Sequence, residues 1–335
     1  MLKIKKNIEL ARHSTFQIGG RAKFFTEVSD EKELQEALEY AKEEKLKYFI
    51  LGGGSNVLFA DDGFDGIVIK VKSQKSKVKI ISQKSKVMLD APAGCLLSDI
   101  INLMAEKGLS GLENLAGIPG TIGGAVWGNA GAYGMTIGDM VEKIRVIEIE
   151  KSGEYEKENQ KSKIKSRKHN LKVKTFLKGQ CGFGYRTSIF KENQGLIIVS
   201  ISLDFKKGDK KEIKNKVQEI LKSRSAKQPK GWKGTAGSFF KNPQIRDKKL
   251  IRIFEREKGM RAKDGKLPAG WLIAEAGFLG KSVGGAKVSE EHGNFILNTG
   301  KAKAEDVVIL ASLIKQKVRQ EFGVELMEEV QYVGF

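Results

Sequence analysis

The chain has 335 residues, of which 40% are hydrophobic, and carries a formal net charge of +19. This length exceeds what one small core organises, so we expect two or three domains. No apolar run approaches the roughly 20 residues that span a bilayer, and the charged N-terminus lacks the apolar centre of a secretion signal. The two cysteines, Cys95 and Cys181, have no metal-ligand spacing and fit a reducing compartment. The sequence therefore predicts a cytoplasmic protein with no metal site and no membrane partner.

The positive charge has two interpretations. One is a basic nucleic-acid-binding protein. However, lysines are spread from Lys3 to Lys317, and the densest groups are interleaved with Glu, Ser and Gln, at Lys70–Lys86, Lys157–Lys178 and Lys206–Lys216. We favour solvated faces and loops, whose field attracts an anionic substrate. The nucleic-acid interpretation remains as an alternative from a different class.

The first region is predicted to run strand, helix, strand. Asp30 and Glu33 have the spacing of a capping box. They precede a helix whose apolar face consists of Leu34, Ala37, Leu38 and Ala41. Short apolar strands are predicted at Tyr48–Leu51 and Ile67–Val71.

The second region opens with a lysine-rich hairpin over Val78–Asp90. A helix at Leu97–Lys107 is expected to end at Gly108. Two strands are predicted further on, at Ile144–Glu150 and Leu196–Phe205. The basic, weakly patterned segment Lys151–Lys178 between them is expected to be an exposed loop.

The third region is predicted to be mainly helical. A helix at Asp209–Arg224 has an apolar face made of Ile213, Val217, Ile220 and Leu221. A short helix follows at Ala269–Ala276. The last helix ends at Gly323 and aligns Val307, Ala311, Ile314, Val318 and Phe322. Strand-like pieces are expected around Met327–Val330.

Two glycine-rich segments suggest a ligand. Gly52–Asn56 follows a strand directly, where successive backbone N–H groups can converge on a phosphate. It is neither a P-loop nor a Rossmann turn, and by itself a tight turn explains it equally well. The segment Gly117–Gly134, GIPGTIGGAVWGNAGAYG, costs chain entropy on ordering, as expected where a large flat ligand approaches the backbone. A packed pair of glycine-rich helices is the alternative.

Six motifs occur in a fixed order from Thr15 to Val333: LGGGSNVL, the segment Gly117–Gly134, GYRTSIF, GSFFKNP, AGWLI and Glu-Glu-Val. Together they resemble the UDP-N-acetylenolpyruvoylglucosamine reductase (MurB) family, the UDP-N-acetylmuramate dehydrogenases. The resemblance implies an α+β fold: an FAD-binding domain of the vanillyl-alcohol-oxidase/PCMH type, with two α+β subdomains, followed by a smaller α+β substrate-binding domain. We expect residues 1–70 with 323–335 to form the first subdomain, 71–206 the second, and 207–322 the substrate-binding domain.

The same resemblance implies non-covalent FAD, with NADPH as co-substrate. The FAD pyrophosphate is expected at Gly52, Gly53, Gly54, Ser55 and Asn56. The residues expected to line the flavin are Ala93, Gly94, Gly117, Pro119, Gly120, Gly123, Gly124, Ala125, Asn129, Gly131 and Ala132.

The implied reaction belongs to peptidoglycan precursor synthesis, which serves the cell wall, cell shape and cell division. NADPH reduces the flavin, which passes hydride to the enolpyruvyl ether of UDP-N-acetylglucosamine enolpyruvate. Arg186 is expected to stabilise the enolate-like charge with its planar guanidinium, Ser238 to donate the proton, and Glu329 to assist beside it. Because Met327-Glu328 stands where the family usually has x-Pro, Glu328 is an alternative to Glu329.

Substrate contacts are expected at Tyr185, Lys227 and Asn242. The chain has no tyrosine between Tyr185 and Tyr332, so it resembles the type II subfamily that lacks a tyrosine-bearing loop. We expect a monomer acting on a small molecule. The alternatives are a structural ion pair for Arg186, a helix cap for Ser238, a surface lysine for Lys227, and a different FAD oxidoreductase acting on an alcohol or sugar with oxygen.

Overall fold

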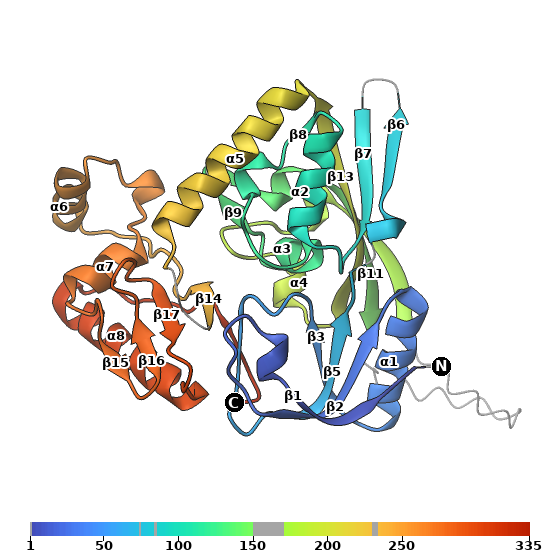
Figure 1. Ribbon diagram of the computed structural model, residues 1–335, viewed down its shortest axis with the longest axis horizontal. Helices are drawn as coiled ribbons and strands as arrows, with labels where there is room; N and C mark the ends of the chain where they lie inside the picture. Colours follow the sequence, from blue (N-terminus) through green and yellow to red (C-terminus); the bar gives the residue numbers. More distant parts are fainter. Residues whose placement is uncertain (1, 74, 84–85, 150–170, 230–233) are drawn as a thin grey trace, which may run out of the picture. The chain divides into compact units, whose positions relative to one another are not determined.

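The structure, a computed structural model, describes all of the chain except residues 1, 74, 84–85, 150–170 and 230–233 (Figure 1). Two compact units make up the chain. The first contains Met1–Lys3, Thr26–Gly52 and Ile69–Val217, and the second contains Ile4–Phe25, Gly53–Val68 and Gln218–Phe335. The chain crosses between them several times, including within β2 (Arg21–Val28), β5 (Phe64–Val71) and α5 (Lys210–Lys227). With β1 (Lys5–Glu9) and β3 (Lys47–Leu51), these two strands form a sheet of order β1-β2-β5-β3.

An antiparallel sheet organises the first unit. Its strand order is β12-β11-β13-β7-β6, with bounds Leu171–Leu177, Val141–Ile149, Leu196–Lys207, Lys86–Pro92 and Lys79–Gln83. Shorter strands are β8 (Leu109–Ser110), which pairs with β13, and the pair β9 (Gly131–Ala132) and β10 (Met135–Thr136). The helices of this unit are α1 (Glu31–Glu43), α2 (Leu97–Glu106), α3 (Ile122–Trp127) and α4 (Ile189–Glu192). Helix α3 packs against β7 and β13 in the middle of the sheet (Figure 1).

The second unit combines a small sheet with helices. The sheet order is β14-β17-β16-β15, with bounds Gly234–Ser238, Phe295–Asn298, Ala286–Val288 and Ser282–Val283. Strand β18 (Gln331–Val333) pairs in parallel with β4 (Val57–Phe59). The helices are α6 (Lys248–Lys258), α7 (Ala269–Glu275) and α8 (Ala304–Phe322), and α8 packs on β15 and β16.

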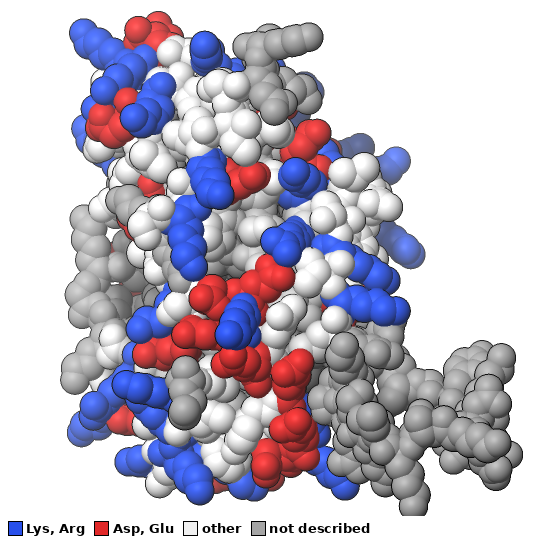
Figure 2. All heavy atoms as spheres, turned by 90° about the vertical axis from the view of Figure 1, so that its right-hand side faces the viewer, with Lys and Arg blue, Asp and Glu red and all other residues white. Residues whose placement is uncertain are grey.

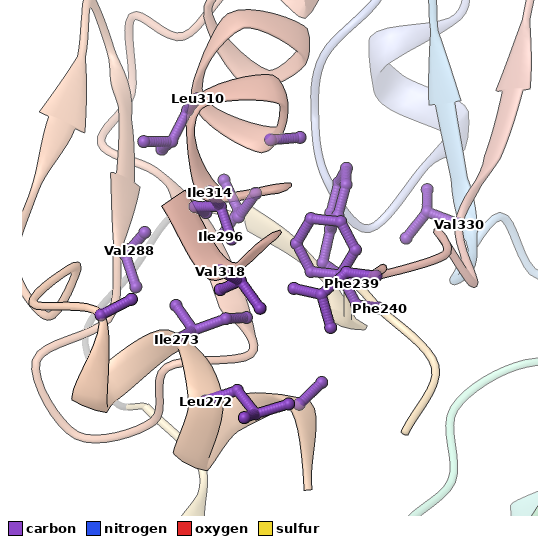
Figure 3. Packing of buried hydrophobic residues seen from close by; sticks show 14 of the residues in the cluster. Phe239, Phe240, Leu272, Ile273, Val288, Ile296, Leu310, Ile314, Val318 and Val330 are labelled. Carbon is purple, nitrogen blue, oxygen red and sulfur yellow. The ribbon is translucent and has the colours of Figure 1, made fainter. Parts of the chain in front are cut away.

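The core of the second unit brings α7, α8 and the small sheet together (Figure 3). Helix α8 buries Val307, Ala311, Ile314 and Val318 completely or nearly so, and it ends at Gly323 in the left-handed conformation. Both features were predicted from the spacing of the apolar residues and the position of the glycine. Phe239 and Phe240 reach into the same cluster, beside Val330 in Figure 3. The segment immediately after Ser238 is therefore anchored by two buried aromatic rings.

Most of the predicted elements are confirmed, with small shifts. The Asp30 side chain accepts the Glu33 N–H at 2.9 Å, which confirms the helix cap, although the Glu33 carboxylate accepts the N–H of Ser29 instead of Asp30. On α5, Leu221 is 36% exposed, so its inclusion in the apolar face was wrong. The strand expected around Met327–Val330 lies later, at β18, because this stretch makes only an isolated bridge.

The exposed loop predicted over Lys151–Lys178 is wrong in its last part. Residues 150–170 lie outside the described chain, but Leu171–Leu177 forms β12 and pairs with β11 in regular antiparallel register. Most β12 side chains are exposed because the strand lies at the edge of its sheet. A lysine-rich edge strand discourages pairing with other chains, and it needs little apolar patterning. Because the apolar pattern of this strand is weak, the sequence predicts a loop there.

Charged side chains of both signs share the surface. On the face drawn in Figure 2, Lys and Arg side chains are interspersed with Asp and Glu. Ion pairs join Arg145 to Glu31 and Lys174 to Glu148. No helix in the part of the chain that the structure describes has the length and apolarity that crossing a membrane requires. Within the same residues, no group of His, Cys, Asp and Glu side chains could hold a metal ion.

Candidate active site

The first glycine loop begins where β3 ends, at Leu51. Gly54 adopts a left-handed backbone with φ of +66°, and a Cβ there would lie 2.1 Å from the carbonyl oxygen of His13. The Gly54 carbonyl accepts the N–H of Thr15 at 2.9 Å. Gly54 is therefore buried against residues 13–15, near the N-terminus, whereas Gly53 is exposed at the tip of the loop. A glycine at each position lets the backbone turn and leaves the tip open to a ligand.

Ser14 is a residue of this loop region that sequence reasoning missed. It is 8% exposed, and its hydroxyl makes no hydrogen bond to any described residue. Its Cα lies 3.0 Å from where a Cβ on Gly54 would stand. A buried hydroxyl without a partner is unusual and calls for an acceptor. A phosphate oxygen at this loop would provide one, so the residues present fit a pyrophosphate.

Replacing Gly54 by alanine is expected to weaken FAD binding by at least about tenfold, because relieving the clash with His13 must shift the loop backbone. The matched control is Gly259→Ala, where φ is +62° but a Cβ meets nothing within 4 Å. Both variants carry the left-handed strain, and only one carries the clash. The flavin-to-protein ratio and the FAD dissociation constant of the two variants measure the difference. Equal FAD affinity in both would contradict this role of the loop.

The second glycine segment and the Ala93–Gly94 turn come together in the first unit. The N–H of Gly123 donates to the Ala93 carbonyl at 2.8 Å, and a Cβ on Gly123 would lie 2.8 Å from the Ala93 Cβ. Thr121 caps α3 by accepting the N–H of Gly124 at 3.2 Å. A Cβ on Gly52 would lie 2.6 Å from the Thr121 hydroxyl oxygen. The start of the first glycine loop is thus in close contact with the second segment.

The second segment also has an open side. Gly117, Pro119 and Gly124 are exposed, whereas Ala93, Gly94, Gly123 and Ala125 are buried. The segment contains the single short helix α3 and the strand β9, so the alternative of a packed helix pair is wrong. A flat ring system can approach exposed glycine backbone closely, because no side chain stands in the way. The buried contact between Gly123 and Ala93 holds this backbone in place.

Arg186 lies in a tight turn of the first unit. The N–H of Gly184 donates to the Thr187 carbonyl at 3.1 Å, and that of Thr187 donates back at 3.3 Å. Arg186 between them has φ of +59°, the left-handed region, which costs a non-glycine residue about 1–2 kcal/mol. Its Nη1 donates to the carbonyl of Gly131 at 3.1 Å. The guanidinium is therefore anchored to backbone that was predicted to line the flavin.

Asn129 links the same two segments. Its Nδ2 donates to the Gly184 carbonyl at 2.8 Å, and its Oδ1 accepts the Gly138 N–H at 3.1 Å. Asn129 is 4% exposed, with φ of 44°. The amide therefore joins the glycine segment to the turn that carries Arg186. Tyr185, in the same turn, is 44% exposed, with its ring centroid 5.7 Å from the Arg186 Cζ.

Ser238 lies in the second unit as the last residue of β14. A register shift between Thr235 and Ser238 marks a bulge, in which Gly237 has φ of +75° and its N–H donates to the Thr235 hydroxyl at 3.2 Å. Bulges re-aim side chains at the end of a strand. Ser238 is half-buried and directly precedes the buried Phe239. It ends a strand, so the alternative of a helix cap is wrong.

Glu329 is held beside this strand end and beside the first glycine loop. Its N–H donates to the Phe239 carbonyl at 2.8 Å, and its carbonyl accepts Asn56 Nδ2 at 3.1 Å. Glu328 pairs with Lys315 of α8, with 2.9 Å between Oε1 and Nζ. The backbone thus brings Ser238, Glu329 and Asn56 together within the second unit, while an ion pair already engages the Glu328 carboxylate.

Asn294 is a second residue that sequence reasoning missed. Its Oδ1 accepts the N–H of Phe240 and its Nδ2 donates to the carbonyl of the same residue, both at 2.8 Å. Its own carbonyl accepts the N–H of Phe239 at 2.8 Å. The Asn294 side chain is only 3% exposed. Its amide makes the two backbone hydrogen bonds with Phe240 that a neighbouring strand would otherwise make. In the sequence only the neighbours in Gly-Asn-Phe mark Asn294, and they do not distinguish it from an ordinary turn residue.

Asn294→Asp is expected to lower the free energy of unfolding by about 1–3 kcal/mol, because a carboxylate cannot donate to the buried Phe240 carbonyl. The matched control is Asn193→Asp on the exposed surface, where Oδ1 only accepts the Gly195 N–H and aspartate keeps that bond. Urea unfolding of both variants measures the difference. Equal midpoints would show that the Asn294 amide does not hold this segment.

Burial shifts the pKa of several side chains near these segments. Desolvation raises the pKa of Cys181 to about 11, so the thiol stays protonated at neutral pH. Burial, followed by the nearby Glu328 carboxylate, raises the pKa of Tyr332, whose ring centroid lies 6.3 Å from that of Phe239. Burial lowers the pKa of His292, which favours the neutral imidazole. In each case burial favours the uncharged form of the side chain.

The remaining predicted contacts are placed as follows. Asn242 is exposed, and its Oδ1 accepts the N–H of Ala269 at the start of α7 at 3.0 Å. Lys227 is the last residue of α5, and its side chain lies outside what the structure describes. The residues grouped in the first unit are Gly52, the residues expected to line the flavin, Tyr185 and Arg186. Those in the second unit are Gly53–Asn56, Ser238, Asn242 and Glu329.

These features define a protein of the FAD-binding class: open glycine backbone, a buried hydroxyl available to a phosphate, and a cation anchored beside the glycine segment. Comparison with known families agrees. The sequence profile described as "FAD binding domain" matches residues 22–157. The profile described as "UDP-N-acetylenolpyruvoylglucosamine reductase, C-terminal domain" matches residues 228–333. The predicted α+β fold with an FAD-binding domain is confirmed.

Full-length relatives identify the family. The chain is 37% identical over 331 residues to a UDP-N-acetylenolpyruvoylglucosamine reductase of Carboxydothermus hydrogenoformans, covering 99% of this chain and 94% of the relative. It is 34% identical over 331 residues to that of Clostridioides difficile, covering 99% and 93%. The crystal structure of the Thermus caldophilus enzyme superposes with a TM-score of 0.72 at 30% identity, over 99% of this chain and all of that one. The chain belongs to the UDP-N-acetylenolpyruvoylglucosamine reductase (MurB) family, and it is a flavoprotein oxidoreductase.

Proposed function

We propose that this chain reduces UDP-N-acetylglucosamine enolpyruvate to UDP-N-acetylmuramate, with NADPH as reductant and FAD bound non-covalently. Its family membership over nearly the full chain supports this reaction. The observation that carries the proposal is the setting of Arg186, whose guanidinium donates to the Gly131 carbonyl in the segment that we propose lines the flavin. A fixed cation at that place suits an acceptor that develops negative charge beside a carboxylate.

Bound FAD would supply the hydride-transfer chemistry between NADPH and one vinyl carbon of the substrate. The electron pair of the double bond then moves toward the substrate carboxylate, and a proton must reach the adjacent carbon. The balance is one NADPH, one proton and one enol ether, giving NADP⁺ and the saturated lactyl ether.

Arg186 would bind the carboxylate side of the substrate and stabilise the enolate-like charge. Its planar guanidinium can donate two parallel hydrogen bonds to a carboxylate. The bond from Nη1 to the Gly131 carbonyl sets where the guanidinium lies before substrate arrives. Such preorganisation avoids reorientation during the reaction.

Ser238 would hold and then donate the proton. A serine hydroxyl is a weak acid, so neighbouring groups must lower the cost of its ionisation. Glu329 is the carboxylate we assign beside it, because its backbone is bonded to the Phe239 carbonyl directly after Ser238.

The other predicted residues are proposed to bind. Gly52 to Asn56 would hold the FAD pyrophosphate, with the Ser14 hydroxyl as an added donor, and the flavin-lining set would contact the ring system. Tyr185, Lys227 and Asn242 would contact the UDP-sugar. The sequence lacks the tyrosine expected of a closing loop, which supports type II character. We further propose a cytoplasmic monomer that acts without nucleic-acid or membrane partners.

Product analysis tests the proposed reaction. The purified holoenzyme, NADPH and UDP-N-acetylglucosamine enolpyruvate should yield a product heavier by two hydrogens, detected by mass spectrometry. In D₂O with unlabelled NADPH, a deuteron should appear at the carbon that receives the proton. NADPH oxidation without conversion of the UDP-sugar, or rapid oxygen consumption with a simple alcohol, would contradict the proposal and favour a different FAD oxidoreductase.

A further inference from the structure

Lys191 is a cation next to Arg186 for which the proposed reaction has no role. It lies on the short helix α4, which directly follows the turn that carries Arg186. Its Nζ donates to the Arg186 carbonyl at 3.2 Å. The same Nζ lies 4.9 Å from the centroid of the Trp127 ring. Trp127 is the last residue of α3, inside the glycine-rich segment.

These contacts bear on the backbone of Arg186. That residue occupies the left-handed region, with φ of +59°, and such a conformation persists only when its surroundings hold it. The Lys191 ammonium binds the carbonyl of this residue, and the guanidinium of the same residue binds the Gly131 carbonyl at 3.1 Å. The backbone and the side chain of Arg186 thus both bond to neighbouring segments.

Further hydrogen bonds connect α4 and its N-cap residue Ser188 to the Arg186 turn and to the end of α3. The Ser188 hydroxyl donates to the Trp127 carbonyl at 2.7 Å, and the Thr187 hydroxyl donates to Glu192 Oε1 at 3.1 Å. Lys191 therefore joins three parts of the first unit: the Arg186 turn, helix α4 and the end of α3. The face of an aromatic ring attracts an ammonium group. The Trp127 ring and the Arg186 carbonyl therefore favour the same position of the Lys191 ammonium.

We infer that Lys191 is a positioning residue, whose ammonium clamps the Arg186 carbonyl against Trp127 and so fixes where the Arg186 guanidinium is presented. The inference rests on the proposed function for its kinetic consequence, but its structural content concerns the turn alone. Lys191 acts through Arg186 and not on the reacting atoms. Its removal should therefore affect the step that uses Arg186 and leave flavin reduction by NADPH unchanged.

Lys191→Met retains the length of the side chain and removes the ammonium. In rapid-mixing experiments with the holoenzyme, we expect reoxidation of the reduced flavin by the UDP-sugar to slow by about 10²-fold, the scale of a small misplacement of a catalytic group. Reduction by NADPH should be unchanged. Lys191→Arg, which can still donate to the carbonyl, should recover most of the rate. Equal slowing of both steps in the methionine variant would overturn the inference.

The control is Lys178→Met, which also removes a lysine that donates to a backbone carbonyl, that of Asp139 at 2.7 Å, outside the Arg186 turn. Both half-reactions of this variant should match the unaltered enzyme. Slowing of its reoxidation to the same extent as in Lys191→Met would overturn the inference, because the loss of charge alone would then explain both.

Hydrogen exchange gives a readout that does not depend on the reaction. In the oxidised holoenzyme, the amides of Gly184 and Thr187 bond across the turn. We expect Lys191→Met to lose protection at these amides, and Lys178→Met to retain it. Unchanged protection in Lys191→Met would overturn the clamp. If the unaltered enzyme is not reoxidised by the UDP-sugar, the proposed function fails, and the exchange result still decides the role of Lys191.

Discussion

Ser238→Ala should leave the reduction of the flavin by NADPH intact and slow its reoxidation by the UDP-sugar by about 10²–10⁴-fold. The reason is that only the second step needs a proton at carbon. The backbone around Ser238 does not depend on its hydroxyl, since Phe239 and Phe240 bury their rings and Asn294 holds their backbone. Stopped-flow measurement of both steps in the absence of oxygen provides the comparison.

Ser312→Ala serves as the control for this variant. Its hydroxyl donates to the Val308 carbonyl on the exposed side of α8, so the substitution removes a serine of the same unit without touching the proposed site. Both half-reactions should be unchanged in it. If Ser238→Ala slowed the two steps equally, Ser238 would be structural and not a proton donor.

Arg186→Lys should slow the same second step by about 10²–10³-fold, although it retains the positive charge. A lysine cannot bind the Gly131 carbonyl and also offer two parallel donors to a carboxylate. Flavin reduction by NADPH should be unaffected. The measured quantity is the limiting rate of reoxidation, together with the substrate concentration that gives half of it.

The control for charge-conserving replacement is Arg145→Lys. Arg145 pairs with Glu31 on the surface of the same unit, with 3.1 Å between Nη2 and Oε1, and such exposed pairs contribute little. We expect no kinetic effect from it. Unchanged turnover in Arg186→Lys as well would show that Arg186 is a structural cation.

The sequence predicted best where a local pattern has a single physical solution. The cap at Asp30, the apolar face of α8 and the left-handed Gly323 all follow from spacings within a few residues. The Ala93–Gly94 turn and the second glycine segment were predicted to share a site, and they are bonded to each other through Gly123. That expectation came from the family resemblance of the ordered motifs, and residue spacing alone did not predict it.

Contacts between distant segments could not be predicted. The Asn129 amide reaches Gly184, and the Asn294 amide reaches Phe240, 54 residues earlier in the chain. Neither asparagine has a local pattern that separates it from an ordinary turn residue. The edge strand β12 was missed for a related reason, because exposed lysines do not mark the pairing of its backbone with β11.

The choice between Glu328 and Glu329 also needed the fold. Adjacent carboxylates in a sequence are chemically equivalent, so the sequence pattern left both as alternatives. In the structure Glu328 pairs with Lys315, 13 residues earlier on α8, and the backbone of Glu329 bonds to Phe239 and Asn56. We propose Glu329 for the reaction because this backbone bond places it at the strand end that carries Ser238.

Reoxidation of the flavin tests the central claim most directly. The holoenzyme is reduced with NADPH without oxygen, UDP-N-acetylglucosamine enolpyruvate is added, and the visible spectrum is followed. The proposed function predicts that the absorption bands of oxidised flavin return as the substrate is consumed. A flavin that NADPH reduces, and that stays reduced when this substrate is added, would contradict it.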